Sequence, residues 1–164
     1  MLIRRNRPDL EKRVGVRRVD GSTLVETAVV LPVFFLFLFT LFEVAHAYMV
    51  VNVLNAAATK AAREGVAEGV TTADVSARVL SVLSAAFDTS AATVYVKDAG
   101  VFDTAGVDPT TIDYANLPSI ELSDADPRQL FVVRVEIPYD SIAILTPKWV
   151  TGVTLTGQSV MRHE

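Results

Sequence analysis

A long apolar stretch near the N-terminus constrains this chain more than any other feature of its sequence. Residues 27–42 carry no charged side chain, and residues 44–51 are apolar except for His46. A helix rises about 1.5 Å per residue and a bilayer core needs about 20 apolar residues, so this stretch is long enough to cross a membrane. We therefore expect a transmembrane helix over residues 22–51, surrounded by the lipid bilayer.

Charge is unevenly distributed on the two sides of this stretch. The first 20 residues contain seven Arg or Lys and three acids, a net charge of +4, whereas the whole 164-residue chain carries −4. Basic residues beside a transmembrane helix usually stay in the cytoplasm. The asymmetry predicts a cytoplasmic segment 1–21 and, in a bacterium, a single-pass protein of the inner membrane with a periplasmic C-terminal domain.

Composition and motifs argue against several classes of function. The chain has no cysteine and two histidines, His46 and His163, so thiolate sites cannot form and no catalytic triad or metal-ligand spacing is recognisable. The basic N-terminus lacks interleaved aromatic residues and directly precedes the apolar stretch, which disfavours nucleic-acid binding. We expect no enzymatic activity, no cofactor, no bound metal and no nucleic-acid partner.

The N-terminal region allows three processing outcomes. Ala45-His46-Ala47 follows the apolar run and has the small-x-small pattern of a signal-peptidase site, so that cleavage there would release a domain beginning at Tyr48. Alternatively, the segment is never cut and acts as a simple anchor. In the third outcome the chain is cut after Gly21, and the apolar helix stays on the mature protein.

Two polar residues interrupt the second half of the apolar stretch. Glu43 and His46 are three residues apart and therefore share a helical face. One interpretation places both among the outer lipid headgroups, where they are solvated. In the other, they form an intramembrane contact with a neighbouring subunit, because ionisable residues inside a membrane are costly and usually have partners.

The remainder of the chain has the pattern of a small α+β domain. We expect the apolar helix to continue as an extension and linker over residues 52–70, with an alanine-rich face that packs either on another helix or on the chain's own domain. Residues 71–164 form the domain, in which a second helix packs on a three-stranded antiparallel sheet. The expected elements are a helix over 73–87, capped by Thr71 or Thr72, and strands over 92–98, 129–140 and 153–161, the last with a possible bulge at Gly157.

A long acidic loop, residues 98–127, separates the first two strands. It contains seven carboxylates and no Lys or Arg: Asp98, Asp103, Asp108, Asp113, Glu121, Asp124 and Asp126. Clustered carboxylates can hold Ca²⁺, but the order of ligands in an EF-hand is absent. We therefore expect a solvated, mobile surface loop that could recognise a partner.

Several motifs together resemble one known family. Gly21-Ser22-Thr23-Leu24-Val25-Glu26 precedes the apolar run, which has an early proline, Pro32. LNAAATKAAREGV follows at residues 54–66, and LTGQSVMRHE ends the chain. This combination resembles TadE-like proteins, the minor pseudopilins of the tight-adherence (Tad, or Flp-type) pilus.

The resemblance implies specific roles for three residues. Prepilin peptidase would cut after Gly21. The free amine of Ser22 would then pair with Glu26 when the helix packs with other pilin-like subunits. The inner-membrane assembly proteins of the Tad system would be further partners. Alternatively, Glu26 only marks a helix N-terminus, where an acid is favoured by the helix dipole. A secreted binding domain released after Ala47 and an anchored envelope protein without a pilus role remain as other functions.

Overall fold

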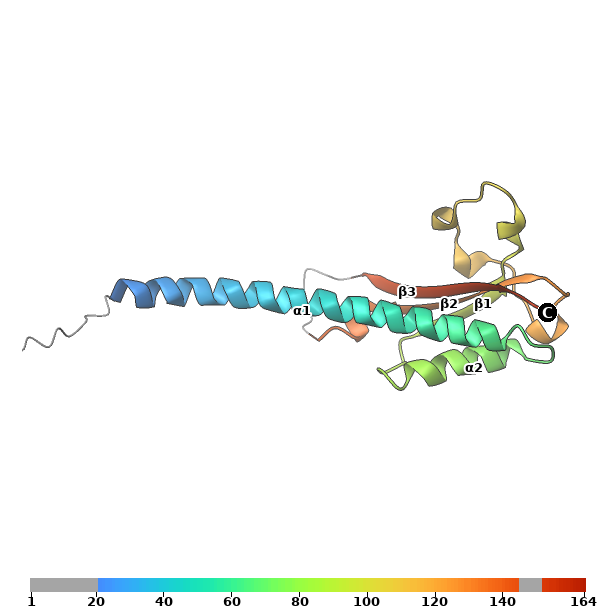
Figure 1. Ribbon diagram of the computed structural model, residues 1–164, viewed down its shortest axis with the longest axis horizontal. Helices are drawn as coiled ribbons and strands as arrows, with labels where there is room; N and C mark the ends of the chain where they lie inside the picture. Colours follow the sequence, from blue (N-terminus) through green and yellow to red (C-terminus); the bar gives the residue numbers. More distant parts are fainter. Residues whose placement is uncertain (1–20, 145–151) are drawn as a thin grey trace, which may run out of the picture. The chain divides into compact units, whose positions relative to one another are not determined.

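The computed structural model describes residues 21–144 and 152–164, with side chains from Thr23 onward. Two helices precede a three-stranded sheet, so the α+β fold class is confirmed (Figure 1). The elements are α1 (Gly21–Glu64), α2 (Thr72–Leu83), β1 (Thr93–Asp98), β2 (Leu130–Pro138) and β3 (Thr154–Arg162). The chain divides after Leu38 into two units, which are described separately.

In the second unit, one face of α1 forms part of the domain core. Its buried positions recur at helical spacing and are mostly small: Val50, Leu54, Ala57, Ala58, Ala61 and Ala62. Small side chains let a sheet approach a helix closely, because little volume separates the two backbones. Of the two interpretations of this alanine-rich face, packing on the chain's own domain is the one observed.

The chain leaves α1 at a glycine-containing turn. Helix α1 ends at Glu64, and Gly69 adopts a positive φ of 80°, a conformation that favours glycine. Helix α2 then begins with a capping box, in which the Thr71 side chain accepts from the Asp74 backbone N–H and the Asp74 carboxylate accepts from the Thr71 backbone N–H. The helix ends at Leu83, four residues before the predicted Phe87.

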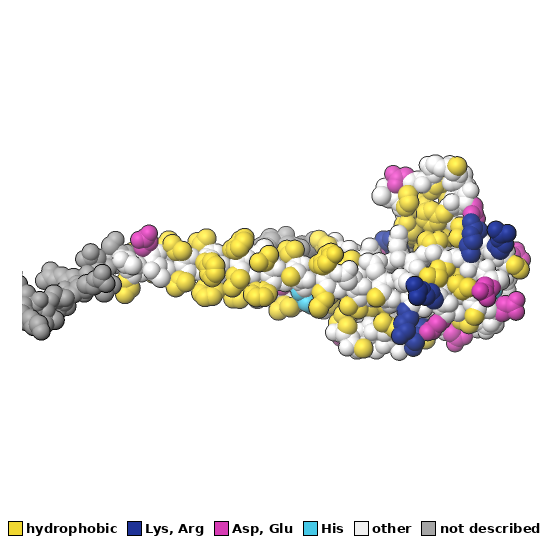
Figure 2. Space-filling view, in the orientation of Figure 1, with side chains coloured by type: hydrophobic (Ala, Val, Ile, Leu, Met, Phe, Trp, Pro, Cys, Tyr) yellow, Lys and Arg dark blue, Asp and Glu magenta, His cyan; other side chains and the backbone are white. Residues whose placement is uncertain are grey.

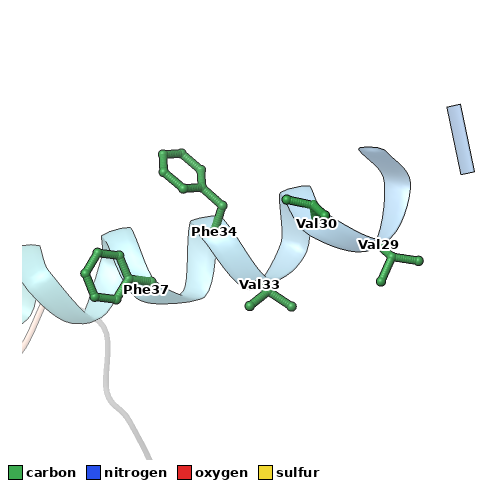
Figure 3. Close-up of a pocket in the computed structure, with 5 residues that line it drawn as sticks. All are labelled: Val29, Val30, Val33, Phe34 and Phe37. Atoms are coloured by element: carbon green, nitrogen blue, oxygen red, sulfur yellow. The ribbon is translucent and has the colours of Figure 1, made fainter. Parts of the chain in front are cut away.

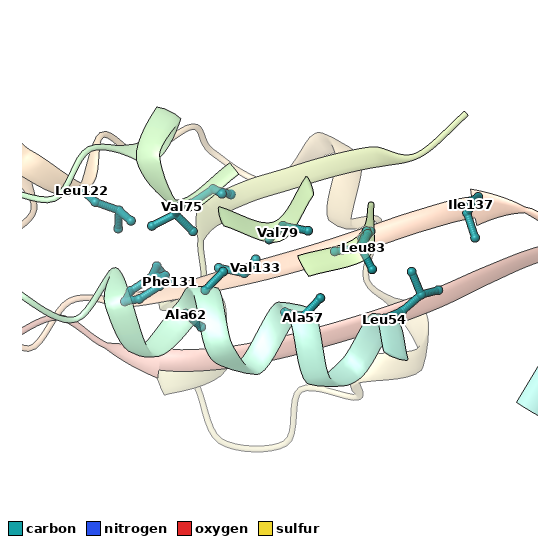
Figure 4. Packing of buried hydrophobic residues seen from close by; sticks show 14 of the residues in the cluster. Leu54, Ala57, Ala62, Val75, Val79, Leu83, Leu122, Phe131, Val133 and Ile137 are labelled. Atoms are coloured by element: carbon teal, nitrogen blue, oxygen red, sulfur yellow. The ribbon is translucent and has the colours of Figure 1, made fainter. Parts of the chain in front are cut away.

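The sheet is antiparallel in the order β1-β2-β3, and its two faces contact different parts of the chain. On β2, alternate residues face the helices and are fully buried, namely Phe131, Val133, Val135 and Ile137. Phe131, Val133 and Ile137 are labelled in Figure 4. They pack with Val75, Val79 and Leu83 of α2 and with the buried face of α1. Burial of this apolar surface is the main stabilising contribution to the domain.

Gly157 does not form a bulge, contrary to the sequence-based prediction. The pairing of β2 with β3 continues without interruption from Leu130–Arg162 to Pro138–Thr154, with Val135 opposite Gly157. A Cβ added to Gly157 would lie 2.5 Å from the backbone nitrogen of Asn55 and 2.6 Å from the Cβ of Leu54. The glycine is therefore required because the strand and α1 touch through their backbones.

The acidic loop has local structure and remains on the surface, and its mobility stays a prediction. It contains four 3₁₀ helices, which span 100–103, 109–111, 114–116 and 122–124. Tyr114 from the loop packs with Ala99 and Val132 in a second, smaller core on the other face of the sheet. The Arg134 guanidinium lies 4.4 Å from the centre of the Tyr114 ring, a cation–π contact that further fixes the loop.

Candidate membrane and assembly segment

The first half of α1 presents large apolar side chains to its surroundings. Helix α1 is long and apolar enough to cross a membrane, judged by length and composition (Figure 2). Exposed side chains that illustrate the band are Leu24, Val25, Val29, Val30, Val33, Phe34, Phe37, Leu41 and Phe42. Leu24 is 73% exposed and Phe37 is 66% exposed, which would be unfavourable in water. This apolar band, residues 24–42, is therefore suited to lipid or to another apolar helix.

A shallow apolar hollow lies along one side of this band. Its lining consists of aliphatic and aromatic side chains from successive turns, namely Val29, Val30, Val33, Phe34 and Phe37 (Figure 3). The hollow offers almost no polar surface, so its chemistry suits an acyl chain or a hydrophobic side chain and not a polar ligand. Pro32 lies inside the helix at this level, and α1 continues through it.

The proposed processing residues lie at the start of α1. Gly21 is the first residue of the helix and Ser22 the second, whereas the basic segment 1–20 lies outside the described residues. Glu26 is exposed in the second turn. This position leaves the carboxylate accessible to another chain and is equally consistent with a favourable interaction with the helix dipole.

Glu43 is buried within the chain's own domain. Its carboxylate is 7% exposed and accepts a hydrogen bond from the Tyr139 hydroxyl. The same oxygen, Oε1, accepts from the backbone N–H of Ile144 at 3.2 Å. The expected solvated position is therefore wrong, because the contact seen is with the chain's own domain. The intramembrane contact with a neighbouring subunit stays a prediction. Burial, followed by the hydrogen bond to Glu43, raises the pKa of Tyr139, so the hydroxyl stays protonated and can donate.

His46 lies one turn after Glu43 and is partly buried. Its Nδ1 atom is buried and has no hydrogen-bond partner within the described residues. The structure thus places both polar residues of the apolar stretch on the side of α1 that faces the domain. No neighbouring subunit is needed to explain the burial of either side chain.

Two contacts between α1 and the domain were missed by sequence reasoning, and one of them had a detectable signal. Glu43 is seven residues before Val50, which is seven before Ala57, so all three belong to one helical stripe. Extension of the buried stripe backward would have placed Glu43 against the domain. The partner Tyr139 is 96 residues away in sequence, and no local pattern indicates it.

Asn55 is the second missed contact. Its side-chain oxygen accepts a hydrogen bond from the Gln158 backbone N–H at 3.1 Å, which ties the edge strand β3 to α1. The side-chain nitrogen of Asn55 donates to the Val51 carbonyl at 3.0 Å. Asn55 therefore supplies a polar contact beside the close approach at Gly157.

The loop carboxylates are used individually in local hydrogen bonds. Asp108 and Asp113 each accept from the backbone N–H two residues later, at 2.9 and 3.1 Å, and so cap their 3₁₀ turns. Glu121 accepts from the Thr72 N–H at 2.8 Å, which ties the loop to the start of α2 and lowers the pKa of Glu121. Within residues 21–144 and 152–164, no three His, Cys, Asp or Glu side chains are grouped so that they could hold a metal ion.

Comparison with known proteins gives one match. No curated protein and no solved structure matches the chain. A family model described as TadE-like protein matches residues 21–63, from the glycine that begins α1 almost to the end of that helix. The match supports a Tad pilus-associated membrane component and confirms the TadE-like assignment over that segment.

Proposed function

We propose that this chain is a minor pseudopilin of a Tad (Flp-type) pilus or a related secretion apparatus, with a structural and not an enzymatic role. The observation that carries the proposal is the joining of an exposed apolar helix to a folded domain with its own core. The apolar band 24–42 packs with the helices of other pilin-like subunits or with lipid. The domain stays in the periplasm, and the N-terminus faces the cytoplasm.

Processing after Gly21 would give Glu26 its role. Removal of residues 1–21 creates a free amine at Ser22, and the Glu26 carboxylate of a neighbouring subunit can pair with such an amine. A buried ion pair of this kind sets the register between helices, because a displaced subunit leaves a charge unpaired in an apolar environment. Prepilin peptidase and the inner-membrane assembly proteins of the Tad system are the partners that this scheme requires.

The packing of Glu43 disfavours the rival function of a secreted domain released after Ala47. Cleavage there would remove Glu43 and leave the Tyr139 hydroxyl and the Ile144 N–H without the acceptor described above. A buried donor that loses its acceptor costs about 1–3 kcal/mol. It would also remove the helical turn on which the Tyr139–Ile144 segment rests.

The experiment that tests the proposal is an intact-mass and N-terminal determination on protein purified from its own membranes. A start at Ser22 is the expected result. A start at Tyr48 would establish the secreted domain instead, and an intact Met1 would leave an uncut anchor whose Glu26 has no free amine to pair with.

Gly21→Ala should block leader removal and retain the full-length chain, because a side chain at the cleaved residue obstructs the peptidase. Intact mass or gel mobility of the membrane protein provides the measurement. Gly100→Ala, the same substitution in the periplasmic domain, is the control and should be processed normally. Normal processing of Gly21→Ala would contradict the assignment.

Glu26→Ala should leave the protein in the membrane and impair its assembly with partner pseudopilins. Removal of one member of a buried ion pair costs about 3–5 kcal/mol, enough to weaken the association with partners about 150-fold or more. Glu68→Ala, which removes an exposed acid after α1, is the matched control. Unchanged co-purification and piliation of the Glu26 variant would refute the register role.

A further inference from the structure

The segment Tyr139–Ile144, here called the domain base, is tied to α1 at the level of Glu43. Both ends of the segment reach the same carboxylate, one through the Tyr139 hydroxyl and the other through the Ile144 backbone N–H at 3.2 Å. Tyr139 is only 4% exposed. The domain base therefore has a fixed position along the helix, one residue after the last residue of the apolar band.

That level coincides with the outer edge of a bilayer. From Leu24 to Phe42 the helix rises about 27 Å at about 1.5 Å per residue, close to a hydrocarbon core of about 30 Å. Glu26 lies only about 3 Å from the inner end of this span, where its carboxylate can reach the headgroups. Glu43 follows directly and has its carboxylate buried in the domain. The domain base begins with a single 3₁₀ turn, Tyr139–Ser141, and the residues after it are irregular. Because exposed backbone of this kind leaves polar groups unpaired in lipid hydrocarbon, the hydrocarbon must end at or before Glu43, where the domain base begins.

Large apolar side chains are exposed around this same level. Ile144 at the end of the domain base is 67% exposed. On α1, Val44 is 62% exposed, Tyr48 is 70% exposed and Met49 is 55% exposed. Tyrosine is enriched where hydrocarbon meets headgroups, because its ring is apolar and its hydroxyl is polar. These four side chains continue the apolar band beyond the end of the hydrocarbon and suit the headgroup layer.

The domain base also carries a carboxylate that limits how deeply it can enter the membrane. Asp140 is exposed, and its Oδ2 accepts from the Gly152 N–H at 3.4 Å. A carboxylate can remain hydrated in the headgroup layer but not in hydrocarbon. Shallow contact with lipid therefore suits both residues, because the Ile144 side chain meets an apolar environment while the Asp140 carboxylate stays hydrated.

From these observations we infer that the domain base rests on the outer surface of the bilayer and that Ile144 enters the headgroup layer, as a second lipid contact beside the transmembrane helix. This inference depends on the proposed transmembrane position of α1. It shortens the expected membrane span from residues 22–51 to about residues 24–42. It also assigns residues 44–49 to the headgroup region.

The absence of cysteine from the sequence makes the inference directly testable. The full chain with Ile144→Cys is labelled with a polarity-sensitive fluorophore and reconstituted into phosphatidylcholine vesicles. Its fluorescence is measured with and without a lipid that carries a nitroxide quencher at a shallow depth. Val44→Cys, at a 62% exposed position next to Glu43, reports nearly the same level on α1, and Phe37→Cys reports the apolar band. Val160→Cys, at a 40% exposed position on β3, is the control remote from the domain base.

The expected result is several-fold stronger quenching at position 144 than at position 160. Position 44 should be quenched to a similar degree as position 144. In a second outcome, quenching at position 144 is no stronger than at position 160, while the label at position 37 is blue-shifted and quenched by the nitroxide lipid. This outcome would overturn the surface contact and leave the membrane anchor intact. If the label at 37 is also exposed to water, the transmembrane position of α1 fails, and the inference fails with it.

Discussion

Replacement of Gly157 by alanine tests the packing that holds the domain to α1. A Cβ at this position would lie 2.5 Å from two backbone atoms, the nitrogen of Asn55 and the carbonyl carbon of Leu54. Carbon atoms pack best at about 3.5–4.0 Å, so β3 and α1 must separate by roughly 1 Å. Neither contact involves a flexible side-chain end that could turn away. The strain therefore falls on the whole sheet–helix interface.

The cost can be estimated from known overpacking effects. An extra methyl group in a well-packed core costs typically about 1–3 kcal/mol, and backbone contacts lie at the upper end. Loss of unfolded-state entropy on replacing glycine by alanine offsets about 0.4–1 kcal/mol of this. We expect a net destabilisation of about 2 kcal/mol or more. It should lower the protection of β2 and β3 amides about 30-fold in hydrogen exchange, provided that these strands open with the whole domain.

Hydrogen exchange measured by mass spectrometry on the full chain in detergent provides the assay, with peptides from β2 and β3 as reporters. Gly100→Ala is the matched control, because a Cβ there meets only the end of the Asp98 side chain, at 3.0 Å. Its effect should stay below about 1 kcal/mol. Equal protection in the two variants would refute the argument that Gly157 is required for the close approach of β3 to α1.

Two further predictions concern polar contacts of the domain. Asn55→Ala should leave the Gln158 N–H without its acceptor and lower the hydrogen-exchange protection of that amide by an amount equivalent to about 1 kcal/mol. Asn52→Ala, at an exposed position on the same helix, is the control and should leave this protection unchanged. Hydrogen bonds from the Thr71 hydroxyl and then the Thr71 backbone lower the pKa of Asp74 below its usual 3.8. The capping-box stabilisation is therefore present above about pH 4 and is lost as the pH falls through the lowered pKa of Asp74. Over that pH range, hydrogen-exchange protection of the α2 amides, corrected for intrinsic exchange, should decrease in the wild type. It should vary less in Asp74→Asn.

Much of the fold could be predicted because its signals are local. Alternation in β2 separates the fully buried Phe131 and Val133 from the partly exposed Arg134, and this follows from the two-residue period of a strand. Thr71 three residues before Asp74 is a recognisable capping box. Such patterns depend on neighbours in the sequence, so one chain is sufficient to read them.

The mistaken predictions share a different physical origin. A glycine inside a strand is consistent with a bulge or with a close backbone approach, and only the position of Asn55, more than 100 residues earlier, decides between them at Gly157. The burial of Tyr114 in the acidic loop also has a non-local origin, because it packs against Val132 of a strand that comes later in the chain. Asp108 and Asp113 of this loop remain exposed while each accepts a backbone hydrogen bond that caps a turn.

The candidate site was only partly predictable for a related reason. Apolar composition identifies residues that can enter a membrane, but it does not distinguish lipid-facing residues from those that a domain buries. Glu43 was therefore assigned to the membrane side of that boundary, although its helical stripe continues into the core through Val50. The family match ends at residue 63 and thus does not include Tyr139, the residue that accounts for the burial of Glu43.

The division of α1 into two halves also restricts how the proposed assembly can form. The alanine-rich face would suit close helix–helix packing, but Ala57, Ala58 and Ala61 are fully buried by the chain's own domain. The opposite face of this half exposes Asn52 and Lys60, which are poorly suited to an apolar interface. Helix packing between subunits must therefore use the band 24–42, where large side chains are exposed and Glu26 lies near one end. An ion pair at Glu26 would then be the main polar determinant of register, because the other carboxylate of the apolar stretch, Glu43, is already held by the domain.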